Sequence, residues 1–503
     1  MKVFLMYKDR DFDPGRELPW NERSLTQDLE LNTLFDAMAH GDNFLFDVAK
    51  KAVLSSESEL DTILYRQDIL KDCLENRAII RNMYDIAVQA IEKKKRDFLG
   101  IFLRYPSHVL SSSIEVMKMF VDMLRKLRTV ADEHAAKFES DGFKAFFLML
   151  GKELNDEYFV KVENHLRELK FPAGALISAQ LGAGNKGVNY VLRKSKEEKK
   201  SNWVEQLFSK KPLAFTYNIH PRDEKGPEFL SKIRDRGINL VANALAQSND
   251  HILSFFNVMR FELAFYVGCL NLYEQLLQLE GPASFPHPAT ASRRSHAFKG
   301  LYDVCLALRM KKKVVGNDLN ADQKNLAIVT GANQGGKSTF LRSIGLAQLM
   351  MQCGMFVSAE SFSANVCDGL ITHYKREEDV TMKSGKLDEE LKRMSEIVDH
   401  IKSNSIVLFN ESFAATNERE GSEIAGQIVR ALVERNIKVF FVTHLYEFAQ
   451  NFFEKETGET IFLRADRLAD GRRTFKLTEG RPLQTSFGKD LYDRIFNWRV
   501  DGY

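Results

Sequence analysis

The sequence has little cysteine and no evident export signal. Its five cysteines among 503 residues are widely spaced, odd in number, and form no CxxC pair. This pattern argues against a disulfide framework or a zinc site, and it favours buried free thiols in a reducing compartment. The N-terminal stretch MKVFLMYKDRDFD lacks the apolar core and the small-residue cleavage site of a secretory signal. We therefore expect a cytoplasmic protein.

The sequence also lacks a charge excess of either sign. The chain has 71 Lys and Arg against 69 Asp and Glu, a net charge of +2. Bulk charge therefore neither requires nor excludes a nucleic-acid partner, and any basic surface must be local. The most apolar long segment, residues 252–277, carries Arg260 and Glu262 near its middle. This placement predicts a buried helix rather than a membrane span.

A chain of this length is too long for one hydrophobic core, so we expect several domains. A short strand is predicted at KVFLMY, near the N-terminus. Glycine and proline are then sparse, and apolar residues recur at helical spacing until about residue 170, which predicts a long helical core or lever. The predicted segments are an N-terminal piece 1–21, helices 22–170, a β insert 171–222, returning helices with a connection 223–297, and an α/β domain 298–503.

The β insert is predicted from FPAGALISAQLGAGNKGVNYVLRK, which has the pattern of two strands around a Gly/Asn turn. GAGNKG satisfies GxGxxG, but a strand-like run follows it, so a hairpin turn is favoured over a dinucleotide site. Residues 193–211 carry a local excess of four positive charges. This stretch is either a solvated loop or a segment that contacts phosphates.

The α/β domain is predicted from strand-like runs that alternate with helical ones. The strand-like runs are LAIVTG, FVSAESFSANV, IVLFNE, KVFFVTH, TIFLRA and RTFKLTEG. GANQGGKS, residues 331–338, satisfies GxxxxGK[ST] directly after the first of them and before a helical run. This context predicts a P-loop that binds the phosphates of ATP. The predicted phosphate-binding residues are Gly331, Ala332, Asn333, Gln334, Gly335, Gly336, Lys337, Ser338 and Thr339.

Two later strands end in polar residues that we expect to lie near this loop, because ligands bind at the carboxyl ends of parallel strands. IVLFNE ends in Asn410 and Glu411, and KVFFVTH ends in His444. Lys337 is the predicted catalytic cation, Glu411 the general base or water-positioning residue, and His444 the γ-phosphate sensor. Ser338 and Asn410 are the predicted Mg²⁺ ligands. Most such sites have Asp where this chain has Asn410, and an amide cannot supply the negative charge that a hard cation favours.

These segments resemble the MutS mismatch-repair ATPases. TGANQGGKSTFLRSIGLAQLMMQCGMFVSAE is similar to the family's phosphate-loop segment, VTHLYEF to its ATHYxEL, and EGRPLQTSFGKDL to its GxxxxSYGxxxA tail. VVGNDLN resembles the segment that packs near adenine, which makes Val315 a nucleotide-binding candidate. The resemblance is looser over the helical part, at LYRQDILKDCLEN. Relative to the family, the chain is expected to lack the N-terminal mismatch-recognition domain and a nuclease-like extension.

The resemblance implies an ABC-type ATPase domain on an α-helical core and lever. It also implies a homodimer whose binding to duplex or branched DNA changes when ATP is bound or hydrolysed. It also implies a serine-bearing signature that completes the partner subunit's ATP site, for which Ser384 and Gly385 are the nearest candidates. Repair proteins are implied as further partners, and a membrane is not. We therefore predict a MutS-type ATPase of mismatch repair or recombination control, with slow turnover because of Asn410. The alternatives are an ABC-type clamp that acts on RNA or protein, and a slowly hydrolysing regulatory module.

Overall fold

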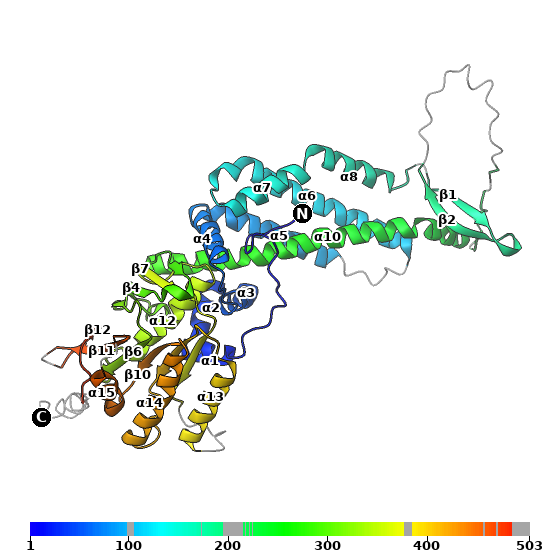
Figure 1. Ribbon diagram of the computed structural model, residues 1–503. Coiled ribbons are helices and arrows are strands. Elements are labelled where there is room, and N and C mark those ends of the chain that lie inside the picture. Colours follow the sequence, from blue (N-terminus) through cyan, green and yellow to red (C-terminus); the bar gives the residue numbers. More distant parts are fainter. Residues whose placement is uncertain are drawn as a thin grey trace, which may run out of the picture. The chain divides into compact units, whose positions relative to one another are not determined.

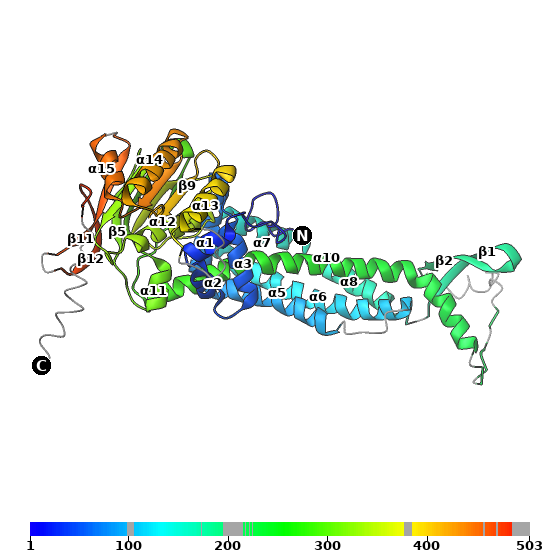
Figure 2. The same cartoon turned by 90° about the horizontal axis from the view of Figure 1, so that it is seen from below.

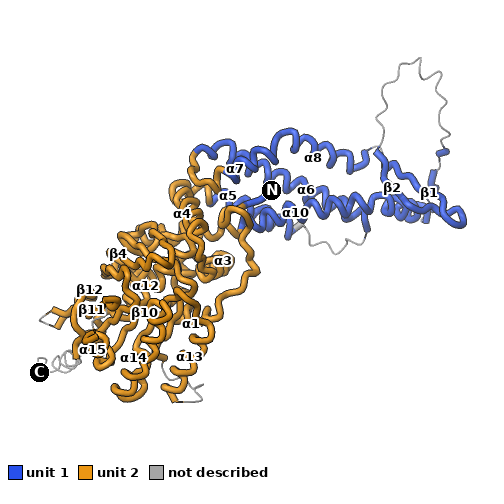
Figure 3. The backbone as a smooth tube through the Cα atoms, in the orientation of Figure 1, with its two compact units in different colours: residues 1–3, 81–136, 145–260 blue, residues 4–80, 137–144, 261–503 orange. Residues whose placement is uncertain are grey.

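The computed structural model describes residues 1–97, 105–172, 174–194, 215–216, 218–220, 222–223, 225–376, 385–455, 458–468 and 471–484. The chain divides into two compact units, coloured separately in Figure 3. Unit 1 comprises residues 1–3, 81–136 and 145–260, and unit 2 comprises residues 4–80, 137–144 and 261–503.

Unit 1 consists mainly of long helices that run alongside one another (Figures 1 and 2). They are most of α5 (Arg77–Asp97), α6 (Pro106–His134), most of α7 (Asp141–Glu153), α8 (Asp156–Glu168) and the first part of α10 (Lys225–Gln278). Buried residues of α6 recur every three or four positions, which gives the helix one apolar face. That face meets α10, where Phe120 stacks on Phe256 with ring centroids 5.9 Å apart.

Unit 1 also contains the predicted hairpin. Strands β1 (Leu176–Leu181) and β2 (Gly187–Arg193) pair antiparallel around a short 3-10 turn, Ala183–Asn185. Gly184 has a φ of 67°, a backbone conformation that glycine adopts without steric cost. Because a strand follows GAGNKG, the preference for a hairpin turn over a dinucleotide site is confirmed. Of the basic stretch at residues 193–211, residues 195–211 lie outside the described residues.

Unit 2 begins with an irregular segment, and the strand predicted at KVFLMY is wrong. The backbone N–H groups of Leu5 and Met6 donate to the Glu262 carboxylate at 2.7 and 3.3 Å. The carbonyl groups of residues 4, 5 and 6 accept hydrogen bonds from Tyr65, Tyr266 and Arg66. Side chains therefore satisfy this backbone, and no neighbouring strand is needed.

The helices that follow in unit 2 are short. They are α1 (Glu22–Asp28), α2 (Leu31–Ala39), α3 (Asn43–Leu54) and α4 (Leu60–Glu75). The N-terminus of α3 is capped by Asp42, whose side chain accepts from the N–H groups of Phe44 and Leu45. The end of α10, from Phe261, also belongs to this unit.

A six-stranded sheet in unit 2 has the order β12-β11-β6-β10-β9-β8. The strands are β6 (Leu326–Gly331), β8 (Leu370–Tyr374), β9 (Ile406–Asn410), β10 (Lys438–Val442), β11 (Thr460–Arg467) and β12 (Arg473–Glu479). All neighbouring pairs are parallel except β11 with β12. Five carboxyl ends therefore share one edge of the sheet, as expected for an α/β nucleotide-binding domain.

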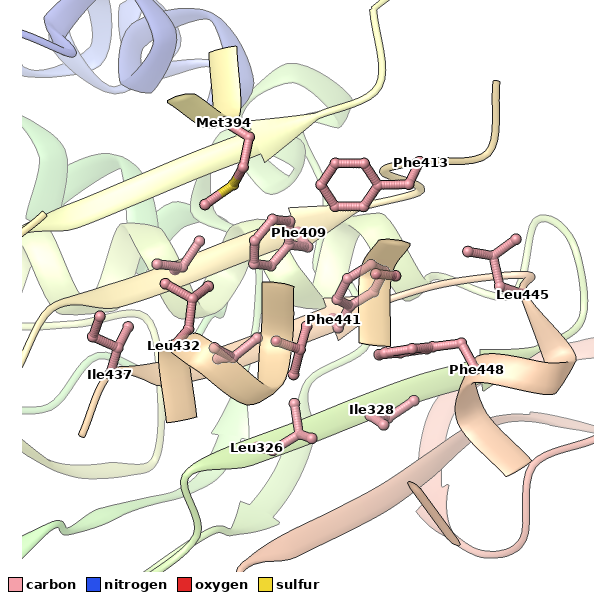
Figure 4. Close-up of a cluster of buried hydrophobic side chains, with 14 of the residues drawn as sticks. Leu326, Ile328, Met394, Phe409, Phe413, Leu432, Ile437, Phe441, Leu445 and Phe448 are labelled. Carbon is pink, nitrogen blue, oxygen red and sulfur yellow. The ribbon is translucent and has the colours of Figure 1, made fainter. Parts of the chain in front are cut away.

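Helices cover both faces of this sheet. Helix α12 (Lys337–Gln352) packs on β8, β9 and β10 on one face. On the other face, α13 (Lys386–His400), α14 (Glu418–Glu434) and α15 (Tyr446–Glu454) enclose the apolar cluster drawn in Figure 4. Alternate residues of the strands enter this cluster, for example Phe409 and Phe441, whose rings stack at 4.9 Å. The strand ends are therefore held between two packed helical layers.

A second sheet of four strands, β3-β7-β4-β5, lies in the same unit. Its strands are β3 (His287–Ala289), β4 (His296–Leu301), β5 (Asn317–Asn320) and β7 (Ser361–Asn365). Helix α11 (Val304–Met310) connects β4 toward β5. Of these elements, the sequence predicted only β7.

Helix α10 is 54 residues long. Among the described residues, it is the one helix that is long and apolar enough to cross a membrane, by length and composition alone. However, 72% of its most apolar window is buried inside the structure. The predicted buried helix at residues 252–277 is therefore confirmed. The five cysteines are all free and buried, as predicted.

Candidate functional site

The predicted phosphate loop connects β6 to α12, as the sequence pattern requires. Gly336 precedes the helix with a φ of 89°, which a side chain would strain. A Cβ added at Gly335 would lie 2.6 Å from the Ala465 Cβ and 2.8 Å from the Ala332 carbonyl oxygen. Glycine is therefore needed here because the loop passes close to β11, and the helix N-terminus beyond it favours an anion.

Lys337 lies inside the loop, only 6% exposed. Its Nζ donates to the carbonyl oxygens of Gly331 at 3.1 Å and Ala332 at 3.0 Å. Burial lowers the pKa of Lys337 to about 8, Glu411 opposes that shift, and Arg473 adds to it. The ammonium group is thus held in a partly dehydrated site, where a bound anion would favour its charged form.

Ser338 and Asn410 meet across two elements that are 72 residues apart in the chain. The Ser338 hydroxyl, at the start of α12, donates to Asn410 Oδ1 at 2.9 Å. Asn410 is the last residue of β9, which pairs with β10 in the parallel sheet. Both predicted Mg²⁺ ligands therefore lie at one point beside the phosphate loop.

Glu411 and His444 also meet. His444 Nε2 lies 3.1 Å from Glu411 Oε1, and both side chains are about one-third exposed. The hydrogen bond from His444 lowers the pKa of Glu411; burial acts against that shift, and the charge of Lys337 assists it. An ionised carboxylate that is partly exposed to solvent can accept a proton from a water molecule.

A cavity of about 530 Å³ opens beside the loop and contains the remaining candidates. Asn333, Gln334, Gly335, Gly336, Lys337, Ser338, Thr339, Val315 and Glu411 line it. Gly331 and Ala332, at the start of the loop, are buried, and their carbonyl groups accept hydrogen bonds from Lys337. Hydrogen bonds connect Asn410 to Ser338 and His444 to Glu411, two residues that line the cavity.

Two residues of β12 border this site and were not predicted. Phe475 has a φ of 59°, is 48% exposed and lines the cavity beside Gly336. Arg473 donates from Nε to the Asn333 carbonyl oxygen at 3.2 Å. The run RTFKLTEG predicted a strand, but nothing in the run itself indicates that Phe475 is exposed. Only the fold brings that strand back to the phosphate loop.

The proposed trans signature is only partly described. Ser384 lies outside the described residues. Gly385 precedes α13 as its N-terminal cap residue, with φ −63° and ψ 155°. A Cβ added at Gly385 would meet nothing within 4 Å, so the residue lies in open space.

The oxygen atoms of Ser338, near the start of α12, and of Asn410, at the end of β9, suit Mg²⁺, which prefers oxygen ligands and keeps several water molecules. Ser338 Oγ and Asn410 Oδ1 would hold the ion, and Glu411 adds the nearest negative charge. When bound, the ion would neutralise phosphate charge.

Comparison with known proteins gives two family matches. The MutS2 N-terminal domain matches residues 58–279, and MutS domain V matches residues 327–490. The first covers helices of both units, and the second covers the phosphate loop and every strand-end residue discussed above.

Curated relatives match over shorter stretches. The DNA mismatch repair protein MutS of Lactobacillus delbrueckii subsp. bulgaricus is 28% identical over 42% of this chain and 26% of its own length. MutS of Thermotoga neapolitana is 31% identical over 36% of this chain and 23% of its own length. Human MutS protein homolog 4 is 25% identical over 45% of this chain and 26% of its own length. The chain thus spans about a quarter of the length of these relatives.

The two family matches and the named relatives agree with the geometry of the phosphate loop and the strand ends. The chain belongs to the MutS family.

Proposed function

We propose that this protein is an ATP-dependent DNA-binding protein that hydrolyses ATP between β6, β9 and β10 and works as a homodimer. One observation carries the ATPase assignment: Lys337, Ser338, Asn410, Glu411 and His444, from three separate parts of the chain, converge at one edge of a parallel sheet. A buried phosphate loop alone would bind phosphate, whereas this set also provides a metal position and a base.

Each of these residues would have a separate role in the reaction. The loop N–H groups and Lys337 would bind the β- and γ-phosphates. Glu411 would orient a water molecule and accept its proton as the water oxygen attacks the γ-phosphorus and the bond to the ADP oxygen breaks. His444, bonded to Glu411, would fix the orientation of that carboxylate and sense the γ-phosphate. The proton removed from water then leaves with the phosphate or through Glu411.

The family membership supports DNA as the partner, because the curated relatives are named as DNA mismatch repair proteins. We infer that unit 1, with the β1–β2 hairpin, provides the DNA contacts and that Lys and Arg bind phosphates there. The role lies in mismatch repair or recombination control, and repair proteins are further partners. Ser384 and Gly385 would complete the ATP site of the second subunit.

The ATP site is tested with Lys337→Ala. This change removes the buried cation, so binding of a fluorescent ATP analogue and ATP hydrolysis should both be lost. Lys402→Ala is the matched control, because Lys402 is exposed and precedes β9 at the opposite edge of the sheet. Unchanged nucleotide affinity in Lys337→Ala would remove the phosphate-loop assignment.

DNA binding is tested by gel shifts with mismatched duplex, four-way junction and single-stranded DNA, each without nucleotide, with ADP and with ATP. We expect binding that weakens with salt and changes with the nucleotide. Binding to none of these DNAs in any nucleotide state would refute the DNA assignment and favour a clamp for RNA or protein. DNA binding that ignores nucleotide would favour a passive module.

A further inference from the structure

The loop that follows Asn410 has an unusual backbone. Glu411 has a φ of 55° and Phe413 has a φ of 61°, so two residues with side chains adopt the left-handed region within three positions. Each such residue is costly and persists only where surrounding contacts hold it. Because Glu411 is the proposed base, the contacts that hold this loop also fix the position of its carboxylate.

A buried polar network supplies those contacts. His373, in β8, places Nδ1 2.7 Å from Ser412 Oγ and Nε2 3.0 Å from the Glu390 carbonyl oxygen. The Ser412 hydroxyl also lies 2.6 Å from the His373 carbonyl oxygen. His373 and Ser412 are fully buried, and Glu390 is 4% exposed. Burial lowers the pKa of His373 to about 4, so the ring is neutral and can donate from Nε2 to the Glu390 carbonyl.

The Glu390 side chain contacts the backbone of the loop directly. Its Oε2 accepts a hydrogen bond from the backbone N–H of Phe413 at 2.8 Å. The Phe413 ring stacks on His373 with centroids 5.2 Å apart and an interplanar angle of 19°. On the other side of the loop, the Glu411 N–H donates to the Val442 carbonyl oxygen at 2.9 Å. The loop is therefore fixed by β10 on one side and by β8 and α13 on the other.

Glu390 belongs to α13, four residues after its first residue Lys386 and five residues after Gly385. A shift of this helix would move the Glu390 carboxylate and carbonyl together, and both bonds that they make would lengthen. The left-handed loop would then lose the contacts that stabilise it.

We propose that Glu390, His373 and Ser412 are positioning residues that hold Glu411 in its left-handed conformation, so that the position of α13 controls ATP hydrolysis. This inference rests on the proposed ATPase function. It makes the helix next to Gly385 a control point for turnover, while nucleotide binding by the phosphate loop remains independent of it.

The test is Glu390→Ala, measured by kcat, by the KM for ATP, by the affinity for a fluorescent ATP analogue and by Tm. We expect kcat to fall about tenfold or more while nucleotide affinity stays within about threefold, because misplacing a catalytic group lowers the rate without removing the phosphate contacts. Glu390→Gln keeps an oxygen acceptor for the Phe413 N–H and should restore most of the rate. Glu396→Ala, at an exposed position of the same helix, is the matched control.

A double variant separates positioning from general damage. In a Glu411→Ala background, Glu390→Ala should not lower the residual rate further, since its effect acts through Glu411. If Glu390→Ala does not fold, Ser412→Ala gives the same comparison. Wild-type kcat in Glu390→Ala, or an equal loss in both backgrounds, would overturn the inference. If the wild type hydrolyses ATP and Lys337→Ala does not, the proposed function stands whatever Glu390→Ala shows; a wild type without hydrolysis overturns both.

Discussion

At the scale of single residues, Asn410 is the feature that most affects the chemistry of this site. Its amide oxygen accepts a hydrogen bond from Ser338, the other proposed Mg²⁺ ligand. An amide brings no negative charge, and Mg²⁺ affinity depends on the charge of its ligands. Glu411 remains ionised beside it, because the bond from His444 lowers its pKa. We therefore expect this site to bind ATP while its affinity for Mg²⁺ is weakened.

Asn410→Asp should strengthen Mg²⁺ binding and raise the rate of hydrolysis. We expect the Mg²⁺ concentration for half-maximal activity to fall about tenfold, equivalent to about 1.4 kcal/mol, because a carboxylate replaces a neutral ligand. The measurement is ATP hydrolysis over a Mg²⁺ titration. Asn410→Ala, which removes the oxygen ligand, should change the Mg²⁺ requirement in the opposite direction. An identical Mg²⁺ requirement in Asn410→Asp and wild type would show that this residue does not tune the metal site.

At the scale of elements, the N-terminal segment depends on one buried carboxyl group of α10. Glu262 is fully buried, and it accepts from the backbone N–H groups of Leu5, Met6 and Phe12. Burial raises the pKa of Glu262 to about 7, and these backbone donors oppose the shift without cancelling it. The segment is thus held to the helix by a carboxyl group that titrates near neutral pH.

The pH dependence of stability should reveal this group. The folded protein holds the Glu262 proton up to about pH 7, whereas the unfolded chain releases it near 4.5. The stabilisation is therefore complete below pH 4.5 and is lost as the pH rises through 7, by about 1.4 kcal/mol per pH unit in that window.

Glu262→Gln provides the comparison, because glutamine does not titrate. Its amide N–H₂ group faces a backbone donor, so the variant should be less stable at pH 4.5 by roughly 1–3 kcal/mol. The free energy of unfolding is measured by urea denaturation of both proteins from pH 4.5 to 8. The difference in the free energy of unfolding between wild type and Glu262→Gln should decrease as the pH rises. A difference that stays constant would mean that Glu262 does not titrate in this range.

At the scale of the whole molecule, the chain separates the proposed DNA contacts from the ATP site. The β1–β2 hairpin and long helices form unit 1, and the phosphate loop and both sheets lie in unit 2. Helix α10 is continuous through the boundary between the units, at Arg260 and Phe261. A single helix therefore joins the part proposed to contact DNA to the part proposed to hydrolyse ATP.

Replacing residues 171–222 with a short Gly/Ser linker should weaken DNA binding and leave basal ATP hydrolysis unchanged. If the insert contributes a share of the phosphate contacts, as proposed, the dependence of log K on log salt should also become shallower. Fluorescence anisotropy with labelled duplex DNA at several salt concentrations measures both quantities. Wild-type affinity and salt slope in the deletion variant would place the DNA contacts elsewhere in the chain.

Local pattern was sufficient for the phosphate loop and for strands β6, β9, β10, β11 and β12. The apolar runs of β6, β9 and β10 end in Gly331, in Asn410 and just before His444. The conformation of the phosphate loop likewise depends on residues that are adjacent in sequence. Strand β8 was missed because LITHY places Thr372 and His373 in a buried strand. Buried polar residues are tolerated there because distant groups satisfy His373, and no local pattern encodes those partners.

The sequence by itself determined the kind of site, because the glycines, Lys337 and the strand-end residues each follow local rules of backbone freedom and charge. Only the tertiary structure decided which residues complete it. Arg473 and Phe475, in β12, return to the loop because β12 pairs with β11 and β11 pairs with β6, and Glu390 reaches the Phe413 backbone from α13. Likewise, Glu262 replaces a strand partner for residues 5 and 6 from more than 250 positions away. Such contacts arise from packing between distant segments, and periodicity in one segment carries no information about them.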